Sequence, residues 1–374
     1  YREQVKRLVT DYDNYISLKL AGDDAYLSEK MVGYPAELDE VYAESFEEQK
    51  KEWFSCVGDG IQECRNTWEH KKWNITDFPE FELAITIDRP ELYYDFLQKD
   101  WTRFCHDYWK NNFLEHHTLS QKRVTRIYIG NQFCHNLFPK KKLLFQVLEK
   151  ALENNLAVTL AFSYIRNHLL EEIDELLQEL EVWCQSREKE AGKDQEEIIV
   201  NDWAMPILLQ GKPHLKPVLG VLLNKRRKDV RLPYKHGIGN HVDSLAENNL
   251  NCGFYQDYLK NTFDIQRFEF ESCGYKVTIP DGHHSLHLPF FQTNTSQYCT
   301  LYAVCRYGDR EKQKLPENCP KYCEQKVFLY PKHLKMVGRY NSLFGYDEKI
   351  LWDEKQLQDY LEQGIDRIVV NVSL

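Results

Sequence analysis

From residue 81 onward, short apolar runs rich in β-branched residues alternate with longer amphipathic segments. The apolar runs lie at residues 81–87, 124–130, 156–162, 198–200, 217–223, 265–270, 275–280 and 367–372. Segments with helical spacing of apolar residues lie between them, including residues 143–152, 169–183 and 245–263. Eight strands that alternate with helices predict an α/β fold of the TIM-like (β/α)8 barrel type, complete or distorted.

The first 78 residues have a different pattern, because they are charged, helical in spacing and contain no comparable strand runs. A chain of 374 residues is long for one domain but fits a barrel with an extension. We therefore predict a helical N-terminal extension over residues 1–78 and a barrel domain over residues 79–374. A cysteine-rich metal segment at residues 299–323 belongs to the barrel domain.

The net charge and the number of cysteines indicate which partners and which cellular compartment to expect. The net charge of -10 argues against a large nonspecific nucleic-acid footprint, which depends on clustered Lys and Arg. No run approaches the eighteen or so apolar residues of a membrane span, so we expect no membrane partner. Eleven cysteines is an odd number, and a chain this large has no need of disulfide staples. We expect a soluble cytoplasmic protein with reduced thiols.

Four cysteines lie close together in sequence near the C-terminus, namely Cys299, Cys305, Cys319 and Cys323. The last two form Cys-Pro-Lys-Tyr-Cys, whose short loop can bring two sulfur atoms together, while the longer insert supplies a third ligand. The pattern predicts a site for a soft metal or a cluster. Four thiolates suit zinc as well as iron and sulfur, so both alternatives stay open.

Cys134 is the best candidate for a ligand from elsewhere in the chain. It follows the predicted strand at residues 124–130, and in a barrel the loops after different strands meet on one face. The remaining cysteines are expected to be small buried side chains. His283, His284 and His287 precede Cys299 and are expected to lie in an ordinary polar loop.

The order of several motifs resembles a known family, the barrel proteins called collagenase-like peptidases, peptidase family U-thirty-two. Within it, the chain is nearest to the anaerobic ubiquinone-biosynthesis and RNA hydroxylase iron–sulfur proteins. The resemblance covers residues 81–374. Its marks are Ile-Tyr-Ile-Gly-Asn-Gln-Phe-Cys at 127–134, Ile-Val-Asn-Asp-Trp at 199–203, the run at 219–231, the cysteine segment at 298–323, and Gly-Ile-Asp-Arg-Ile-Val-Val at 364–370.

The resemblance implies an oxygen-sensitive 4Fe–4S cluster and oxygen-independent hydroxylation of a small molecule or an RNA base, with prephenate as oxygen source in some relatives. The implied ligands are Cys134, Cys299, Cys319 and Cys323. A heteromeric partner of the same family is a further implication. Cys305 is an additional cysteine that could replace Cys299 or Cys134, and the N-terminal extension lies outside the family core.

Polar residues after two predicted strands form a candidate substrate rim. A carboxylate such as prephenate would need the forked guanidinium groups that Arg provides. The candidate residues are Asn201, Asp202, Arg227, Asp229 and Arg231, with Asn224 and Lys225 beside them. The alternative is that Asp202 and Asp229 form ordinary surface ion pairs. Trp203 is expected to pack in the core.

The sequence is compatible with two other functions. A noncatalytic, zinc-stabilised barrel that acts as a binding module is the main alternative to an iron–sulfur enzyme. Proteolysis ranks third, because the sequence has no Gly-x-Ser-x-Gly elbow and no His-Glu-x-x-His pair.

Overall fold

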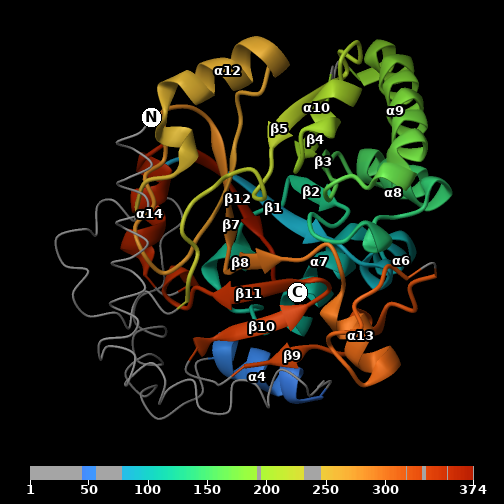
Figure 1. Cartoon of the computed structure of the whole chain (residues 1–374). Coiled ribbons are helices and arrows are strands. Elements are labelled where there is room, and N and C mark those ends of the chain that lie inside the picture. The colour runs from blue at the N-terminus through green and yellow to red at the C-terminus, as the bar shows by residue number, and fades with distance from the viewer. Residues whose placement is uncertain are drawn as a thin grey trace, which may run out of the picture.

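The structure is a computed structural model that describes residues 44–55, 78–191, 195–230, 246–316, 318–330, 334–351 and 353–373. Eight parallel strands form one sheet in the order β5-β4-β3-β2-β1-β12-β7-β6. A bridge between Leu219 and Phe268 joins its two edges, and the Leu219 N–H donates to the Arg267 carbonyl at 3.0 Å. The fold is therefore a (β/α)8 barrel, as the alternating pattern predicted (Figure 1).

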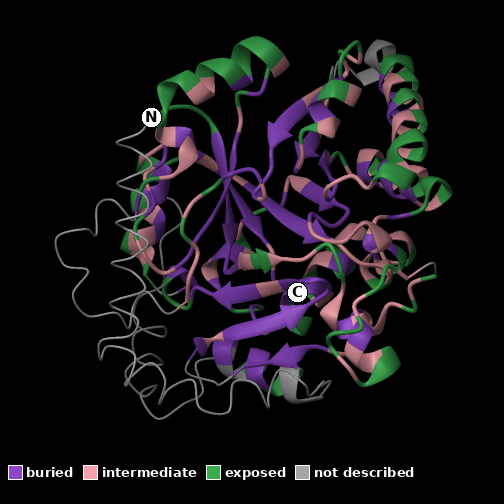
Figure 2. Ribbon diagram, in the orientation of Figure 1, coloured by how far each residue is buried: buried purple, intermediate pink, exposed green. Residues whose placement is uncertain are grey.

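The barrel strands are short and mostly buried (Figure 2). They are β1 (Glu82–Ile87), β2 (Arg126–Ile129), β3 (Ala157–Ala161), β4 (Glu196–Val200), β5 (Leu215–Leu219), β6 (Glu269–Glu271), β7 (His284–Leu288) and β12 (Ile365–Val370). The larger outer helices are α6 (Pro90–Gln98), α7 (Trp101–Asn111), α8 (Lys141–Glu153), α9 (Leu170–Ala191), α12 (Gly253–Phe263) and α14 (Glu354–Glu362). Helices α8, α9 and α14 pack on β3, β5 and β12, respectively.

An antiparallel sheet is inserted between β7 and β12. Its strands are β8 (Phe290–Thr295), β9 (Phe328–Leu329), β10 (Met336–Arg339) and β11 (Ser342–Tyr346), in the order β8-β11-β10-β9. Helix α13 (Thr300–Tyr307) follows β8. The cysteine-rich segment therefore belongs to this insertion and not to the barrel wall.

One predicted strand is wrong. Residues 275–280 form no strand, because their backbone bonds to the segment before α12: the Thr278 N–H donates to the Ala246 carbonyl, and the Asn248 side chain donates to the Thr278 carbonyl. The seventh barrel strand is β7 instead. His284 and His287, expected in a polar loop, are thus buried strand residues. The polar residues of β7 interrupt the run of apolar residues by which a buried strand is recognised in the sequence.

The predicted helix at 245–263 is also shorter than expected. Among its described residues, a 3-10 turn covers Asn249–Asn251 and the helix proper begins at Gly253. In the N-terminal extension, the structure describes helix α4 (Glu44–Ser55). Trp53 of α4 stacks on Tyr346 of β11, with ring centroids 5.1 Å apart. Residues 1–43 and 56–77 of the predicted extension, including Cys56 and Cys64, lie outside the described residues.

The barrel interior is charged at the amino ends of the strands and apolar in the middle. Arg367 contacts Glu82 and Glu197 with N–O distances of 2.6 Å, and Arg126 contacts the same two carboxylates. Above this network lies a small apolar layer of Ala84, Tyr128, Ala161, Ile199, Val218 and Val369. The amino end of the barrel is thereby filled, which leaves the carboxyl end for cavities.

No helix among the described residues is long and apolar enough to cross a membrane.

Candidate functional site

Three separate segments carry the predicted cysteine ligands to one region. Cys134 lies in the loop after β2, where its N–H donates to the Asn131 side chain at 2.9 Å. Cys299 caps the N-terminus of α13, and its thiol accepts from the Tyr302 N–H at 3.3 Å. Cys323 lies in the 3-10 turn Tyr322–Glu324, four residues beyond Cys319.

These four thiols lie near enough to influence one another electrostatically. The pKa of Cys134 is raised to about 11 and that of Cys299 to about 12; burial is the main cause, and the Cys319 thiol contributes to both increases. Burial also raises the pKa of Cys323, and the nearby Cys134, Cys299 and Cys319 thiols raise it as well. We call Cys134, Cys299, Cys319 and Cys323 the four-cysteine site. At neutral pH its thiols are protonated, so a metal would have to displace their protons.

The turn between β10 and β11 holds the cysteine segments in place. The Cys299 thiol donates to the Tyr340 carbonyl at 2.9 Å, and the Arg339 side chain donates to the Cys323 carbonyl at 2.8 Å. The Asn341 side chain donates to the Ser296 carbonyl at 2.6 Å. The insertion therefore supplies both the thiols and the scaffold that positions them.

Cys305 has different surroundings from these four cysteines. Its pKa is raised by burial and lowered by Lys326, with no resolved contribution from another cysteine. It lies in α13, six residues after Cys299. In the described part of the chain, no group of three or more His, Cys, Asp or Glu side chains is arranged to hold a metal ion. The cysteines described are all free thiols.

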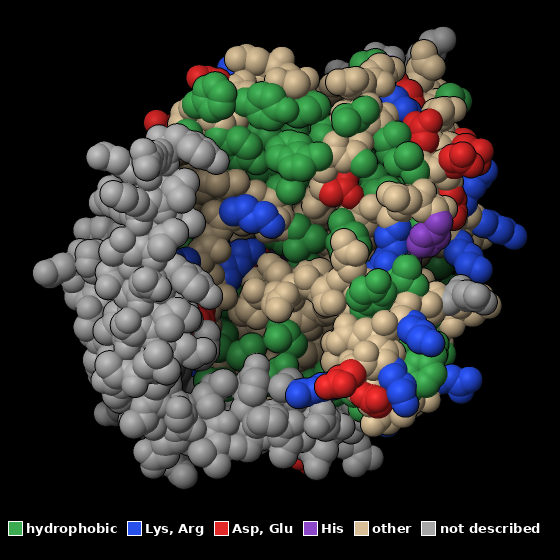
Figure 3. Space-filling view, viewed as in Figure 1, with side chains coloured by type: hydrophobic (Ala, Val, Ile, Leu, Met, Phe, Trp, Pro, Cys, Tyr) green, Lys and Arg blue, Asp and Glu red, His purple; other side chains and the backbone are tan. Residues whose placement is uncertain are grey.

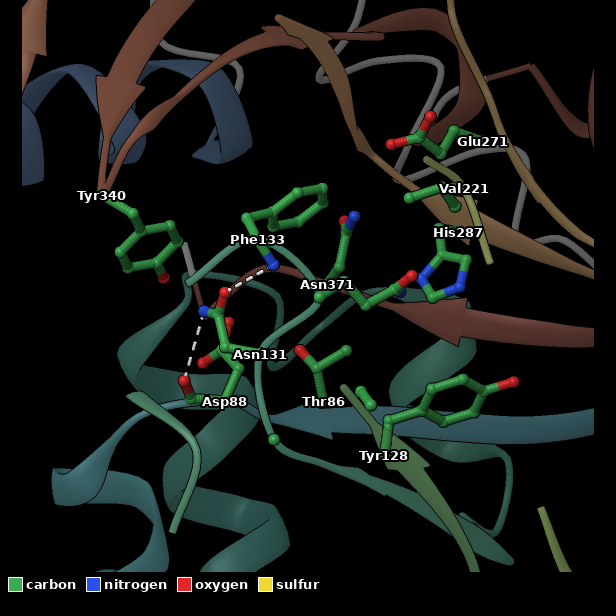
Figure 4. Close-up of a pocket in the computed structure, with 13 residues that line it drawn as sticks. Thr86, Asp88, Tyr128, Asn131, Phe133, Val221, Glu271, His287, Tyr340 and Asn371 are labelled. Carbon is green, nitrogen blue, oxygen red and sulfur yellow. Dashed lines mark hydrogen bonds between the residues drawn. The ribbon is translucent and has the colours of Figure 1, made fainter. Parts of the chain in front are cut away.

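Two cavities lie at the carboxyl end of the barrel. The inner cavity, of about 30 Å³, is lined by residues from the barrel mouth and the insertion, among them Asp88, Asn131, Glu271, His287 and Tyr340 (Figure 4). It adjoins the four-cysteine site through Tyr340, whose carbonyl binds the Cys299 thiol, and through Asn131, whose side chain binds the Cys134 N–H.

The outer cleft is larger, about 620 Å³, and lies between the loops after β3, β4 and β5 and strand β8. Lys225, Arg226 and Lys228 line it, and the face in Figure 3 is hollowed near its centre with Lys and Arg side chains inside. Val221 lines both cavities, so they are neighbours. Lys228, of the outer cleft, pairs with Glu271, of the inner cavity.

The predicted substrate rim coincides with this cleft only in part. Asn201 and Asp202 line it, but both have structural contacts: Asn201 bonds the Phe162 carbonyl at 2.8 Å, and Asp202 accepts from the Ala204 N–H at 3.0 Å. The Asn201 side chain also explains why position 220 is a glycine: a Cβ atom added to Gly220 would lie 2.1 Å from the side-chain oxygen of Asn201. Arg227 is exposed and, like Asp229, is not among the cleft residues, and Arg231 lies outside the described residues.

The predicted substrate rim did not include Arg226 and Lys228, although both belong to the dense basic cluster at residues 225–228. Trp203 was expected in the core, but its side chain is 41% exposed, because it caps the short helix α10 (Ala204–Leu208) at the surface. It contacts Tyr255, Tyr258 and Phe263, and hydrophobic side chains gather over α10 and α12 in Figure 3.

Comparisons with protein-family models, with curated proteins and with solved structures found no match for this chain. The fold and the two cavities define a (β/α)8-barrel protein with an inserted antiparallel sheet beside its mouth.

Proposed function

We propose that this chain is an iron–sulfur protein whose four-cysteine site binds a 4Fe–4S cluster and that it takes part in oxygen-independent hydroxylation of a small molecule or an RNA base. The observation that carries the proposal is the grouping of the four thiols. They come from the loop after β2 and from two parts of the insertion, yet Cys319 raises the pKa of Cys134 and of Cys299, and all three of these thiols raise the pKa of Cys323. The resemblance to family U-thirty-two points to the same four residues.

The donor set fits such a cluster chemically. Four thiolates are the usual ligands of 4Fe–4S clusters, and each binds a different iron, whereas zinc would need all four sulfur atoms about 2.3 Å from one ion. When bound, the cluster would supply one-electron transfer. Arg339 lies near Cys323 and opposes the burial that raises the pKa of this thiol, so its positive charge would help to offset the negative charge of bound thiolates.

The cavities support a substrate next to the four-cysteine site. Tyr340 and Asn131 contact both the inner cavity and the cysteine segments. The basic residues of the outer cleft suit a carboxylate group, because Lys and Arg bind carboxylates by charge-assisted hydrogen bonds. We therefore propose a small carboxylate, of the prephenate type, as ligand of the outer cleft, and a reducing cytoplasmic environment for the free thiols.

The decisive experiment is purification without oxygen, followed by an absorption spectrum and by assays of iron, sulfide and zinc. We expect a brown protein with broad absorption near 400 nm, roughly where iron–sulfur charge transfer occurs, and with equal amounts of iron and sulfide. A colourless protein that contains one zinc per chain would contradict the proposal and favour a zinc-stabilised binding module. A matched control is Cys184→Ala, because Cys184 is buried and distant in sequence from the four-cysteine site.

A further inference from the structure

The inner cavity contains polar atoms that the protein itself leaves unpaired. Tyr340 is 3% exposed, and among the described residues its hydroxyl has no hydrogen-bond partner. The same holds for the buried Oδ1 atom of Asp88. Both residues line the cavity, and they lie on the same side of Asn131 in Figure 4. Because an unpaired buried polar atom costs about 1–3 kcal/mol, we expect a water molecule or a ligand group in the cavity to pair with these two atoms.

A buried histidine–carboxylate pair lies at the other side of this cavity. The Nε2 atom of His287 is 2.5 Å from the Oε2 atom of Glu269, and neither side chain is more than 3% exposed. The Tyr128 hydroxyl also donates to Glu269, at 3.1 Å. His287 lines the cavity whereas Glu269 lies behind it. An ionised Glu269 only accepts hydrogen bonds and would therefore place the proton of the neutral His287 ring on Nε2.

The orientation of His287 leaves its second ring nitrogen for a ligand. Among the described residues, the hydrogen bond of the His287 ring is made by Nε2, and no hydrogen bond to its Nδ1 is present. With Nε2 protonated, Nδ1 of the neutral ring is an acceptor, and a carboxylate behind the ring stabilises the positive charge that forms when Nδ1 takes a proton. This is the arrangement by which a carboxylate orients a histidine base in other enzymes.

We propose that the inner cavity binds hydroxyl groups of a small polyhydroxylated molecule, and that His287, oriented by Glu269, exchanges a proton with one of them. In that step the O–H bond breaks and an N–H bond forms at Nδ1. A second hydroxyl group of the ligand accepts a hydrogen bond from the Tyr340 hydroxyl and donates one to the Asp88 carboxylate. A cavity of about 30 Å³ takes roughly two water-sized groups, so a larger substrate would extend past Val221 into the outer cleft. The inference does not require a metal at the four-cysteine site.

The first test measures the protonated ring nitrogen of His287 in the full chain. Histidine labelled with ¹⁵N and long-range ¹H–¹⁵N correlation spectra distinguish the two tautomers, and His287→Gln assigns the signal. We expect the proton on Nε2. His117 is an internal reference, because its Nε2 bonds the Leu351 carbonyl and its Nδ1 accepts from the Leu119 N–H. A proton on Nδ1 of His287 at neutral pH would overturn the proposal.

The second test adds ethylene glycol, a two-hydroxyl probe of suitable size, to the same labelled protein. We expect a saturable shift of the His287 Nδ1 signal and none of His117. Tyr340→Phe removes one hydrogen bond, so the probe should bind about fivefold more weakly. Tyr258→Phe, on the exposed face of α12, is the matched control and should leave binding unchanged.

Equal binding to wild type and Tyr340→Phe, or no shift at His287, would refute the proposed ligand site. Iron content, measured on the same sample, separates this inference from the proposed function. A protein without iron that binds the probe at His287 would retain the inner-cavity site while contradicting the iron–sulfur proposal.

Discussion

The charged network at the amino end of the barrel allows a quantitative prediction. Glu197 is 12% exposed and contacts Arg367 and Arg126. Burial alone would raise its pKa, but the guanidinium groups of Arg126, Arg367 and Arg267 outweigh this and lower the pKa from 4.5 to about 2. A difference of that size corresponds to about 3 kcal/mol of stability at neutral pH. Glu197→Gln keeps the shape but removes the charge, so we expect a loss of about 3 kcal/mol.

The assay is urea unfolding followed by circular dichroism for wild type and Glu197→Gln. Glu179→Gln is the matched control, because Glu179 pairs with Lys141 at the surface, where ion pairs contribute about 0–1 kcal/mol. We expect the control to stay within about 0.5 kcal/mol of wild type. A loss below about 1 kcal/mol for Glu197→Gln would refute this account of the network, since breaking buried pairs usually costs about 3–5 kcal/mol.

The pH dependence provides an independent check. A carboxylate whose pKa is lower in the folded state stabilises the protein above the unfolded pKa, and this stabilisation is lost as the pH falls through the folded pKa. For Glu197 the loss begins near pH 4.5 and ends near pH 2. The difference between wild type and Glu197→Gln should thus fall from about 3 kcal/mol at pH 7 to about 2 kcal/mol at pH 3.5. A difference that does not change with pH would mean that packing, not charge, causes it.

Three further predictions concern the metal site, the cleft and a helix end. Cys323→Ala should abolish iron retention in anaerobically purified protein, because loss of a thiolate exposes the metal to water, whereas Cys305→Ala should retain the iron. Full iron in Cys323→Ala would argue against Cys323 as a ligand. Lys225→Glu should weaken binding of a small dicarboxylate in the outer cleft at least fivefold by calorimetry, and unchanged affinity would place the carboxylate elsewhere. Asp353→Ala should lower stability to urea by about 1 kcal/mol, since its side chain caps α14 through two N–H groups; no loss would mean that the cap is unimportant.

The sequence was sufficient for the class of fold because strand and helix periodicity are local properties. The runs at 81–87, 124–130, 156–162 and 367–372 all correspond to barrel strands, and the segments at 143–152 and 169–183 to helices. Each of these strands is buried on both faces, so its residues read as continuous apolar runs. The pattern failed at β7, where Ser285 and His287 face a polar interior and interrupt the run.

The relation between distant segments was decided by tertiary structure. Cys305 lies close to Cys319 and Cys323 in sequence, yet burial and Lys326 are what shift its pKa, whereas the distant Cys134 contributes to the pKa of Cys323. Likewise, no local pattern could pair Glu269 with His287 or place Tyr340 beside Asp88, because these contacts depend on which strands are neighbours and on the turn of an inserted sheet. Local spacing reveals which residues can do chemistry, while closure of the barrel decides which of them meet.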